Sequence, residues 1–217
     1  MVCKLVCFDC DGTLVDEVEF IWQFVHRSLG IDRGRILRAT EDFRSGRITF
    51  AEWARHDVAL WIGKGANRQV LTGIVGRLRL MNGAMETLEE LRRRGMRLAV
   101  VSGGIDIVLD RFIPGYKDIF DRVMINRLVF GGDGSLRGII PTEFGADEFK
   151  AEGLRKIAGE FGLGLGDCAF VGDSDNDVEI AKQAGLSIGF NPHPRLAEVC
   201  DVVIRKKDLR EVLKYII

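Results

Sequence analysis

The stretch that decides the fold lies near the N-terminus and reads Val6-Cys7-Phe8-Asp9-Cys10-Asp11-Gly12-Thr13-Leu14-Val15. Its apolar beginning predicts a buried strand, which is followed at once by two carboxylates and a glycine turn. Residues i and i+2 of an extended segment point the same way, so Asp9 and Asp11 should project together from the strand end. Carboxylates held this close repel each other unless they share a cation or a proton. Because ligands of open α/β sheets bind at the carboxyl ends of strands, the stretch predicts a site.

Size and charge exclude several classes of protein. The chain has 217 residues, of which 47% are hydrophobic and 29% charged, as expected for a globular protein with a substantial core. The net charge of −1 gives no electrostatic footprint for nucleic acid. No apolar run approaches the ~20 residues that a membrane helix needs, and the segment before Asp9 is too short for a signal peptide. We therefore expect no nucleic-acid partner, no membrane partner and a cytoplasmic location.

The cysteines raise one alternative. Cys7 and Cys10 form a C-x-x-C pair, which is a spacing used by redox and zinc sites. Such a site needs a helix N-terminus or a second Cys/His pair, whereas this pair straddles a strand end. We expect packed, reduced thiols here.

Residues 16–80 show helical periodicity and no convincing strand. Thr49 and Glu52 have the spacing of a capping box at the start of one of the helices. This part of the chain predicts a small helical bundle inserted between two βα units. The expected helices cover residues 17–29, 33–44, a segment starting after Thr49, and 67–79.

From Met81 onward helices and strands alternate, which predicts an α/β fold with a mostly parallel sheet covered on both faces. We therefore expect a core domain of residues 1–15 and 81–217. A hairpin with the glycine turn Gly131-Gly132-Asp133-Gly134 is expected within it. Expected strands are 97–101, 122–125, 128–130, 136–140, 168–171, 186–190 and 202–204, and expected helices are 84–94, 105–112, 147–161, 176–184 and 209–216.

Polar residues follow two further strands of the predicted sheet. Ser102-Gly103-Gly104 places a hydroxyl and close-approaching backbone N–H groups after one strand, a pattern suited to an anion. Gly172-Asp173-Ser174-Asp175-Asn176-Asp177 follows another strand and is rich in the oxygen ligands that Mg²⁺ prefers. Lys150 lies early in the helix expected at 147–161 and could reach the same crevice. Taken singly, these are an ordinary turn, a helix cap and a surface lysine; their order along the chain favours one shared site.

That ordered set, with Asp-x-Asp-Gly-Thr first and Gly-Asp-x-x-x-Asp last, resembles the haloacid dehalogenase superfamily of phosphotransferases, and most closely its phosphoserine phosphatase branch. The resemblance covers the whole chain. It implies a Rossmann-like core with an inserted α-helical cap of the C1 type, which matches residues 16–80. A cap of this kind must close over the site, so the resemblance also implies that residues 16–80 move relative to the core.

The resemblance also assigns roles. Asp9 would be the nucleophile that forms an aspartyl-phosphate, and Asp11 would transfer the proton to the leaving group and from water. Mg²⁺ would be held by Asp9, the backbone carbonyl of Asp11, Asp173 and Asp177. The residues that would bind the phosphoryl group are Ser102, Gly103, Lys150 and Asn176.

Asp11 favours one reaction class, because hydrolysis of a phosphomonoester needs an acid for the leaving group. The expected partner is a small phosphorylated metabolite, acted on by a monomer or a homodimer. Two alternatives stay open: phosphoryl transfer to an acceptor other than water, and a non-catalytic phosphate-ligand binding protein on the same scaffold.

The substrate is the least determined feature. The resemblance implies a Glu after the first motif and an Arg in the cap that clamp the amino acid of phosphoserine. The aligned positions here are Val18 and Asp57. Glu17, Glu19 and Arg55 lie close to them, and Arg44 and Arg47 are further cap cations. Taken literally, Asp57 would repel a substrate carboxylate, so phosphoserine and another small phosphomonoester both stay open.

Overall fold

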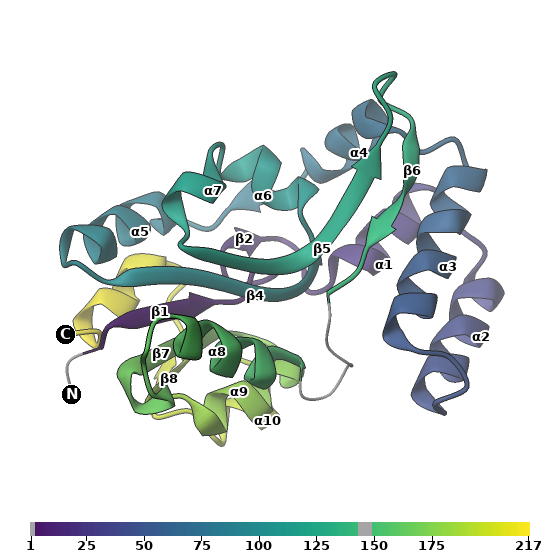
Figure 1. The fold of residues 1–217 in the computed structure, drawn as a ribbon. Helices are drawn as coiled ribbons and strands as arrows, with labels where there is room; N and C mark the ends of the chain where they lie inside the picture. Colours follow the sequence, from purple (N-terminus) through teal and green to yellow (C-terminus); the bar gives the residue numbers. More distant parts are fainter. Residues whose placement is uncertain (1–2, 143–148) are drawn as a thin grey trace.

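A seven-stranded sheet forms the centre of the protein in a computed structural model, which describes residues 3–142 and 149–217 (Figure 1). The strand order is β6-β5-β4-β1-β7-β8-β9, and every neighbouring pair is parallel except β5 and β6. The expected mostly parallel α/β sheet is therefore confirmed. The strands are β1 (Leu5–Phe8), β4 (Arg97–Ile105), β5 (Arg122–Phe130), β6 (Leu136–Ile140), β7 (Cys168–Gly172), β8 (Leu186–Phe190) and β9 (Val202–Ile204).

The register brings three strand ends together. Phe8 of β1 is paired with Val100 of β4 on one side and with Val171 of β7 on the other. The residues that follow these three positions therefore emerge at the same edge of the sheet. Asp9, Ser102 and Asp173, which are far apart in sequence, become neighbours for this reason.

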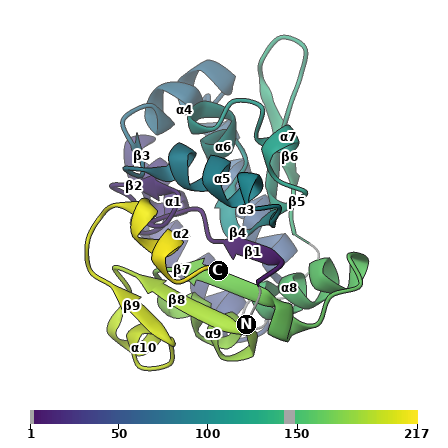
Figure 2. The same ribbon diagram turned by 90° about the vertical axis from the view of Figure 1, so that its left-hand side faces the viewer.

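Helices cover both faces of the sheet. Helices α5 to α7 lie on one side and α8 to α10 on the other (Figures 1 and 2). Alternate residues of β1 serve the two layers, since Val6 and Phe8 belong to one hydrophobic cluster and Leu5 and Cys7 to the other. The helices are α5 (Ala84–Arg93), α6 (Ile107–Phe112), α7 (Tyr116–Ile119), α8 (Phe149–Glu160), α9 (Val178–Gln183) and α10 (Pro194–Ala197).

The C-x-x-C pair is part of this packing. Cys7 and Cys10 are fully buried free thiols that lie in different hydrophobic clusters. Burial raises the pKa of both thiols, so neither forms a thiolate readily. The expectation of packed, reduced cysteines is confirmed.

Four helices lie between β1 and α5, as the periodicity predicted: α1 (Ile21–Ser28), α2 (Arg33–Arg44), α3 (Phe50–Gly63) and α4 (Arg68–Val75). Thr49 and Glu52 form the expected capping box at the start of α3. The side chains of Trp22 and Trp61 join the same hydrophobic cluster as Val100 of the central sheet. The β5–β6 hairpin also reaches these helices, because the Arg68 N–H donates to the Gly134 carbonyl at 2.8 Å.

Several boundaries differ from the sequence expectations. Residues 16–80 were expected to hold no strand, yet Val15–Asp16 (β2) and Arg79–Leu80 (β3) form a short antiparallel pair where the chain leaves and re-enters the core. The first helix starts at Ile21 instead of Glu17, because Asp16 is in that pair and Glu17 has a left-handed φ of 67°.

In the core, β5 is continuous where two strands were expected, and β4 extends through the glycines to Ile105 with a shifted register, so α6 begins only at Ile107. The last segment forms a 3₁₀ helix, Leu209–Lys214, in place of an α-helix. The short helices α7 and α10 were not predicted. Positions 147 and 148 of the helix expected at 147–161 lie outside the described residues.

Candidate active site

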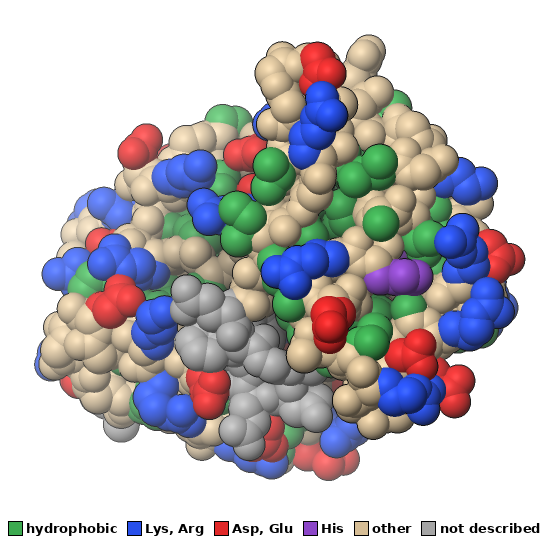
Figure 3. Space-filling view, turned by 45° about the vertical axis from the view of Figure 1, so that its right-hand side comes forward, with side chains coloured by type: hydrophobic (Ala, Val, Ile, Leu, Met, Phe, Trp, Pro, Cys, Tyr) green, Lys and Arg blue, Asp and Glu red, His purple; other side chains and the backbone are tan. Residues whose placement is uncertain are grey.

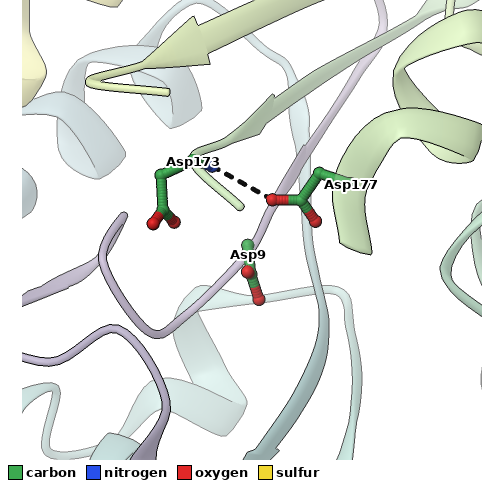
Figure 4. Close-up of side chains that lie close together, drawn as sticks. All are labelled: Asp9, Asp173 and Asp177. Atoms are coloured by element: carbon green, nitrogen blue, oxygen red, sulfur yellow. Dashed lines mark hydrogen bonds between the residues drawn. The ribbon is translucent and has the colours of Figure 1, made fainter. Parts of the chain in front are cut away.

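Three carboxylates from two neighbouring strand ends converge at the carboxyl edge of the sheet. Asp9 follows β1, Asp173 follows β7, and Asp177 ends the 3₁₀ turn Asp175–Asp177 (Figure 4). One oxygen of each lies within 4.8 Å of the others. The Asp177 Oδ2 accepts from the backbone N–H groups of Asp173 and Ser174, both at 3.0 Å, so the loop after β7 is folded around this side chain.

Lys150 supplies the compensating positive charge. Its Nζ donates to Asp9 Oδ2 at 2.8 Å and to Asp177 Oδ1 at 2.5 Å, and the side chain is buried. Burial alone lowers the pKa of Lys150, but the charges of Asp177 and Asp9 outweigh it and raise that pKa above its usual value. The lysine therefore stays protonated and bridges two of the three carboxylates.

The cluster nevertheless holds too much negative charge for one lysine. Burial, with the charges of Asp9 and Asp177, raises the pKa of Asp173 to about 9. Burial also raises the pKa of Asp177 to about 6, although Lys150 opposes the shift. Crowded carboxylates of this kind retain protons unless a cation replaces them. Because all the donors are hard oxygens, the set fits a cation such as Mg²⁺.

Asp11 is buried beside this cluster but turned toward the helices. Its Oδ2 accepts from the Ile21 N–H at the start of α1, at 2.9 Å, and its Oδ1 has no hydrogen-bond partner among the described residues. Burial and the nearby charge of Asp9 raise the pKa of Asp11 to about 7. A carboxyl group that holds its proton near neutral pH and has one free oxygen is suited to proton transfer.

The segment of β4 after Val101 is held by several hydrogen bonds. The Ser102 Oγ accepts from the Gly104 N–H at 3.1 Å, and the Asn126 side-chain amide donates to the carbonyls of Gly103 and Gly104, both at 2.9 Å. A second donor reaches the Gly103 carbonyl, the Trp22 Nε1–H of α1, also at 2.9 Å. The sequence alone assigned no such role to Asn126 or Trp22, although the segment Asn126-Arg127-Leu128 also resembles the family.

The glycine and threonine of the first motif act on Asp173. The Thr13 hydroxyl donates to Asp173 Oδ1 at 2.8 Å. Gly12 has a φ of 74°, and a Cβ at this position would lie 2.1 Å from Asp173 Oδ2. Only glycine therefore lets the two motifs approach each other. Thr13 was not among the predicted site residues, although its place in the motif was the available signal.

The structure thus gathers six predicted residues: Asp9, Asp11, Ser102, Lys150, Asp173 and Asp177. All of them except Asp173 are more than nine-tenths buried. Asn176 is different, because it is exposed on the turn that precedes Asp177 and its side chain makes no hydrogen bond to the described residues. The geometry gives it no contact with the cluster.

Comparison with known proteins agrees with this arrangement. Residues 3–185 match the model of the haloacid dehalogenase-like hydrolase family. The chain belongs to this family. It is 38% identical to a phosphoserine phosphatase of Methanocaldococcus jannaschii over 213 residues, which are 98% of this chain and 97% of that protein.

Solved structures show the same likeness along the whole chain. A phospho-aspartyl intermediate analogue of a phosphoserine phosphatase matches with a TM-score of 0.75 and 35% identity, and a substrate-bound phosphoserine phosphatase complex with 0.76 and 34%. Both alignments cover 100% of each chain. This haloacid dehalogenase-like hydrolase is accordingly a phosphoric monoester hydrolase of the phosphoserine phosphatase-like branch, working through an aspartyl-phosphate.

In this hydrolase, the two positions that align with the phosphoserine-clamping Glu and Arg are both buried. Val18 is 8% exposed and Asp57 fully buried. The Asp57 Oδ2 lies 3.0 Å from His26 Nε2, and its Oδ1 lies 3.0 Å from His56 Nδ1. Both carboxylate oxygens of Asp57 are thus engaged by histidines.

None of the helices in the described parts of the chain has the length and apolar character required to traverse a membrane.

Proposed function

We propose that this hydrolase cleaves a small phosphorylated metabolite with Asp9 as the nucleophile and Asp11 as the proton donor and acceptor. The observation that supports it is the pairing of two unlike carboxyl groups at one strand end. Asp9 receives a hydrogen bond from Lys150, whereas Asp11 has a free oxygen and a pKa raised to about 7. Groups with opposite proton demands on one site are typical of acid–base catalysis.

Two displacements complete the reaction. An Asp9 oxygen attacks phosphorus while the bond to the leaving oxygen breaks, and Asp11 gives its proton to that oxygen. Water then attacks the phosphorus of the aspartyl-phosphate, and Asp11 takes the water's proton. Inorganic phosphate leaves, and the Asp9 carboxylate and the Asp11 carboxyl group are restored.

We assign the phosphoryl oxygens to Ser102, the Gly103 N–H and Lys150. These donors surround the place where negative charge develops, and burial strengthens their effect. Asn176 remains a weaker candidate, since it is exposed in this structure.

Mg²⁺ is the proposed cofactor. Asp9, Asp173 and Asp177, with the Asp11 backbone carbonyl, would hold it, and Thr13 would orient Asp173. When bound, the ion supplies the positive charge that offsets the crowded carboxylates and the incoming phosphate.

The proposed substrate is phosphoserine or a related small phosphomonoester. Phosphoserine is favoured by the relatives, including the M. jannaschii phosphoserine phosphatase. Another phosphomonoester is favoured by Val18 and by the engagement of Asp57 with His26 and His56, which leaves neither side chain to clamp an amino acid.

A panel of phosphomonoesters that includes phosphoserine, assayed with Mg²⁺ for phosphate release, tests the function. We expect turnover that Asp9→Asn abolishes. Turnover retained by Asp9→Asn would contradict the mechanism, and binding of phosphate esters without turnover would favour the non-catalytic alternative. Release that depends on an added alcohol acceptor would favour phosphoryl transfer.

The remaining assignments stay predictions: a cap of residues 16–80 that moves over a core of residues 1–15 and 81–217, a monomer or homodimer, and a cytoplasmic location. Hydrogen exchange with and without substrate, sedimentation and cell fractionation test them respectively.

A further inference from the structure

A hollow lies among the helices between β1 and α5, and its lining residues are distant in sequence from those of the carboxylate cluster. Its volume is about 590 Å³, and it is formed by the turn before α2, the start of α2 and the C-terminal half of α3. Ile31 and Leu60 are among its apolar lining residues, and Arg35, His56 and Lys64 are polar ones. A smaller hollow of about 360 Å³ adjoins it between α2 and α3, shares Arg35 and His56, and adds Arg38.

The charges around the two hollows are unbalanced. Among the described residues, the side chains of Arg35, Arg38 and Lys64 form no ion pair. Figure 3 shows Lys and Arg side chains over the whole visible face, with Asp and Glu side chains among them on its right-hand side. The lining acids are already engaged: Asp32 accepts from the Arg35 backbone N–H at 3.0 Å, Asp42 pairs with Arg47, and Glu52 is in the capping box. A hydrogen bond from a neutral donor leaves Asp32 and Glu52 charged, and only Asp42 is neutralised by an ion pair. Arg35, Arg38 and Lys64 therefore outnumber the remaining lining acids by one charge, and this net positive charge favours an anionic ligand.

His56 is held in one orientation at the wall of the hollow. Its Nδ1 lies 3.0 Å from Asp57 Oδ1, and its ring is 39% exposed. Because a carboxylate accepts only, Nδ1 must bear the hydrogen, and Nε2 remains for a ligand. Nε2 can donate a hydrogen bond to an anion only in the imidazolium form, in which both ring nitrogens carry hydrogen.

Asp57 links His56 to the interior. Its other oxygen lies 3.0 Å from His26 Nε2, while the Trp61 Nε1–H donates to His26 Nδ1 at 3.0 Å. His26 Nδ1 is thus an acceptor, and His26 must donate to Asp57 through Nε2. This buried chain of directional hydrogen bonds has a single arrangement of protons.

This series of contacts ends at Gly103 in β4, where we propose that the phosphoryl group binds. The ring of Trp61 packs against that of Trp22, with centroids 5.2 Å apart. The Trp22 Nε1–H donates to the Gly103 carbonyl at 2.9 Å. A displacement of His56 therefore has a continuous path of packed and hydrogen-bonded side chains to Gly103.

We propose that this hollow is a binding site for the anionic group of a small molecule, a carboxylate or a phosphate, held by Arg35, Lys64 and His56 Nε2, and that His26, Asp57, Trp61 and Trp22 link its occupancy to the Gly103 loop. The site lies outside the catalytic groups, and its binding test does not depend on the proposed function.

The binding test follows the imidazole signals of His56 in ¹H–¹⁵N spectra during titration with malonate and, separately, with sulfate; His56→Gln identifies the signals. Malonate probes a carboxylate ligand and sulfate a phosphate-like one. We expect a saturable shift with at least one of them, weakened about tenfold or more in the double variant Arg35→Gln/Lys64→Gln. The matched control Arg137→Gln/Lys182→Gln removes the same charge from exposed positions elsewhere and should keep the shift.

No saturable shift with either probe, or a shift that survives in Arg35→Gln/Lys64→Gln, would overturn the site. The link is tested with the probe that binds, by measuring KM for phosphate release with and without it. We expect a change in KM that Trp22→Phe removes, because phenylalanine keeps a ring but lacks the donor to Gly103, while the His56 shift persists. Binding that leaves KM and kcat unchanged in the wild-type protein would overturn the link.

Discussion

The Lys150 Nζ lies 2.8 Å from Oδ2 of Asp9, a residue 141 positions away in sequence, and also contacts Asp177, so one buried cation joins the proposed nucleophile to the proposed metal-ligand loop. Lysine here offsets the repulsion between the carboxylates, and it is also the proposed donor to the phosphoryl group. Both follow from a site that is buried, where a charge without a partner is costly.

Replacing this cation should slow the chemistry strongly. We expect Lys150→Met, which keeps the length of the side chain, to reduce phosphate release by about 10²-fold or more, because the transition-state charge loses a preorganised donor. The measurement is kcat with circular dichroism to confirm folding. Lys182→Met is the control, since this lysine pairs with Glu179 on the exposed surface. Near wild-type kcat in Lys150→Met would contradict the assignment.

Removing the proton of Asp11 should affect esters according to their leaving group. Asp11→Asn is expected to slow hydrolysis of an alkyl phosphate by about 10²–10⁴-fold, because no acid protonates the departing alkoxide. Hydrolysis of p-nitrophenyl phosphate by the same variant should slow much less, since nitrophenolate leaves without needing a proton. The ratio of the two kcat values is the readout, and Asp175→Asn, an exposed carboxylate on the neighbouring turn, is the control. Equal losses for both esters would argue against the role of Asp11.

Metal removal should abolish activity and lower stability together. A chelator is expected to stop phosphate release, and added Mg²⁺ should restore it. Because Mg²⁺ should bind the folded state and not the unfolded one, it should also raise the free energy of unfolding. The increase is about 2.7 kcal/mol at a Mg²⁺ concentration of one hundred times Kd. Thermal unfolding with and without Mg²⁺ measures this, and the increase should disappear in Asp173→Asn but not in Asp175→Asn. Full activity in excess chelator would refute the metal proposal.

Thr13 should act through Asp173. Thr13→Val removes the 2.8 Å hydrogen bond to Asp173 Oδ1 at nearly constant volume. Because a ligand that loses its orienting partner binds metal more weakly, we expect the Mg²⁺ concentration for half-maximal activity to rise about 10–100-fold. Activity at saturating Mg²⁺ should recover, which separates this effect from damage to the fold. Thr40→Val is the control, since its hydroxyl bonds only within its own helix, to the Ile36 carbonyl; an unchanged Mg²⁺ requirement in Thr13→Val would rule the role out.

Much of the fold could be predicted because its signals are local. Apolar periodicity located the four helices between β1 and α5, and the Thr49–Glu52 capping box began α3 as expected. The β2–β3 pair escaped prediction because the strand partners of Val15 and Asp16 are Leu80 and Arg79, more than sixty positions away. The continuous β5 was missed for a similar reason: the strand is held by pairing with β4 on one side and β6 on the other, and not by its own pattern.

The site divides in the same way. By itself, the sequence determined the chemistry, because Asp9, Asp11, Lys150, Asp173 and Asp177 stand in motifs whose residue types already demand a cation and an anion. Only the tertiary structure decided how these groups are held and which partners surround Asp57 in the helical segment between β1 and α5. Asn126 and Trp22 donate hydrogen bonds to the Gly103 carbonyl. Thr13 donates one to Asp173, and Asp57 lies within hydrogen-bond distance of two histidines, His26 and His56. The physical reason is that motif residues act through their own functional groups, whereas these roles arise from directional hydrogen bonds between segments that only folding brings together.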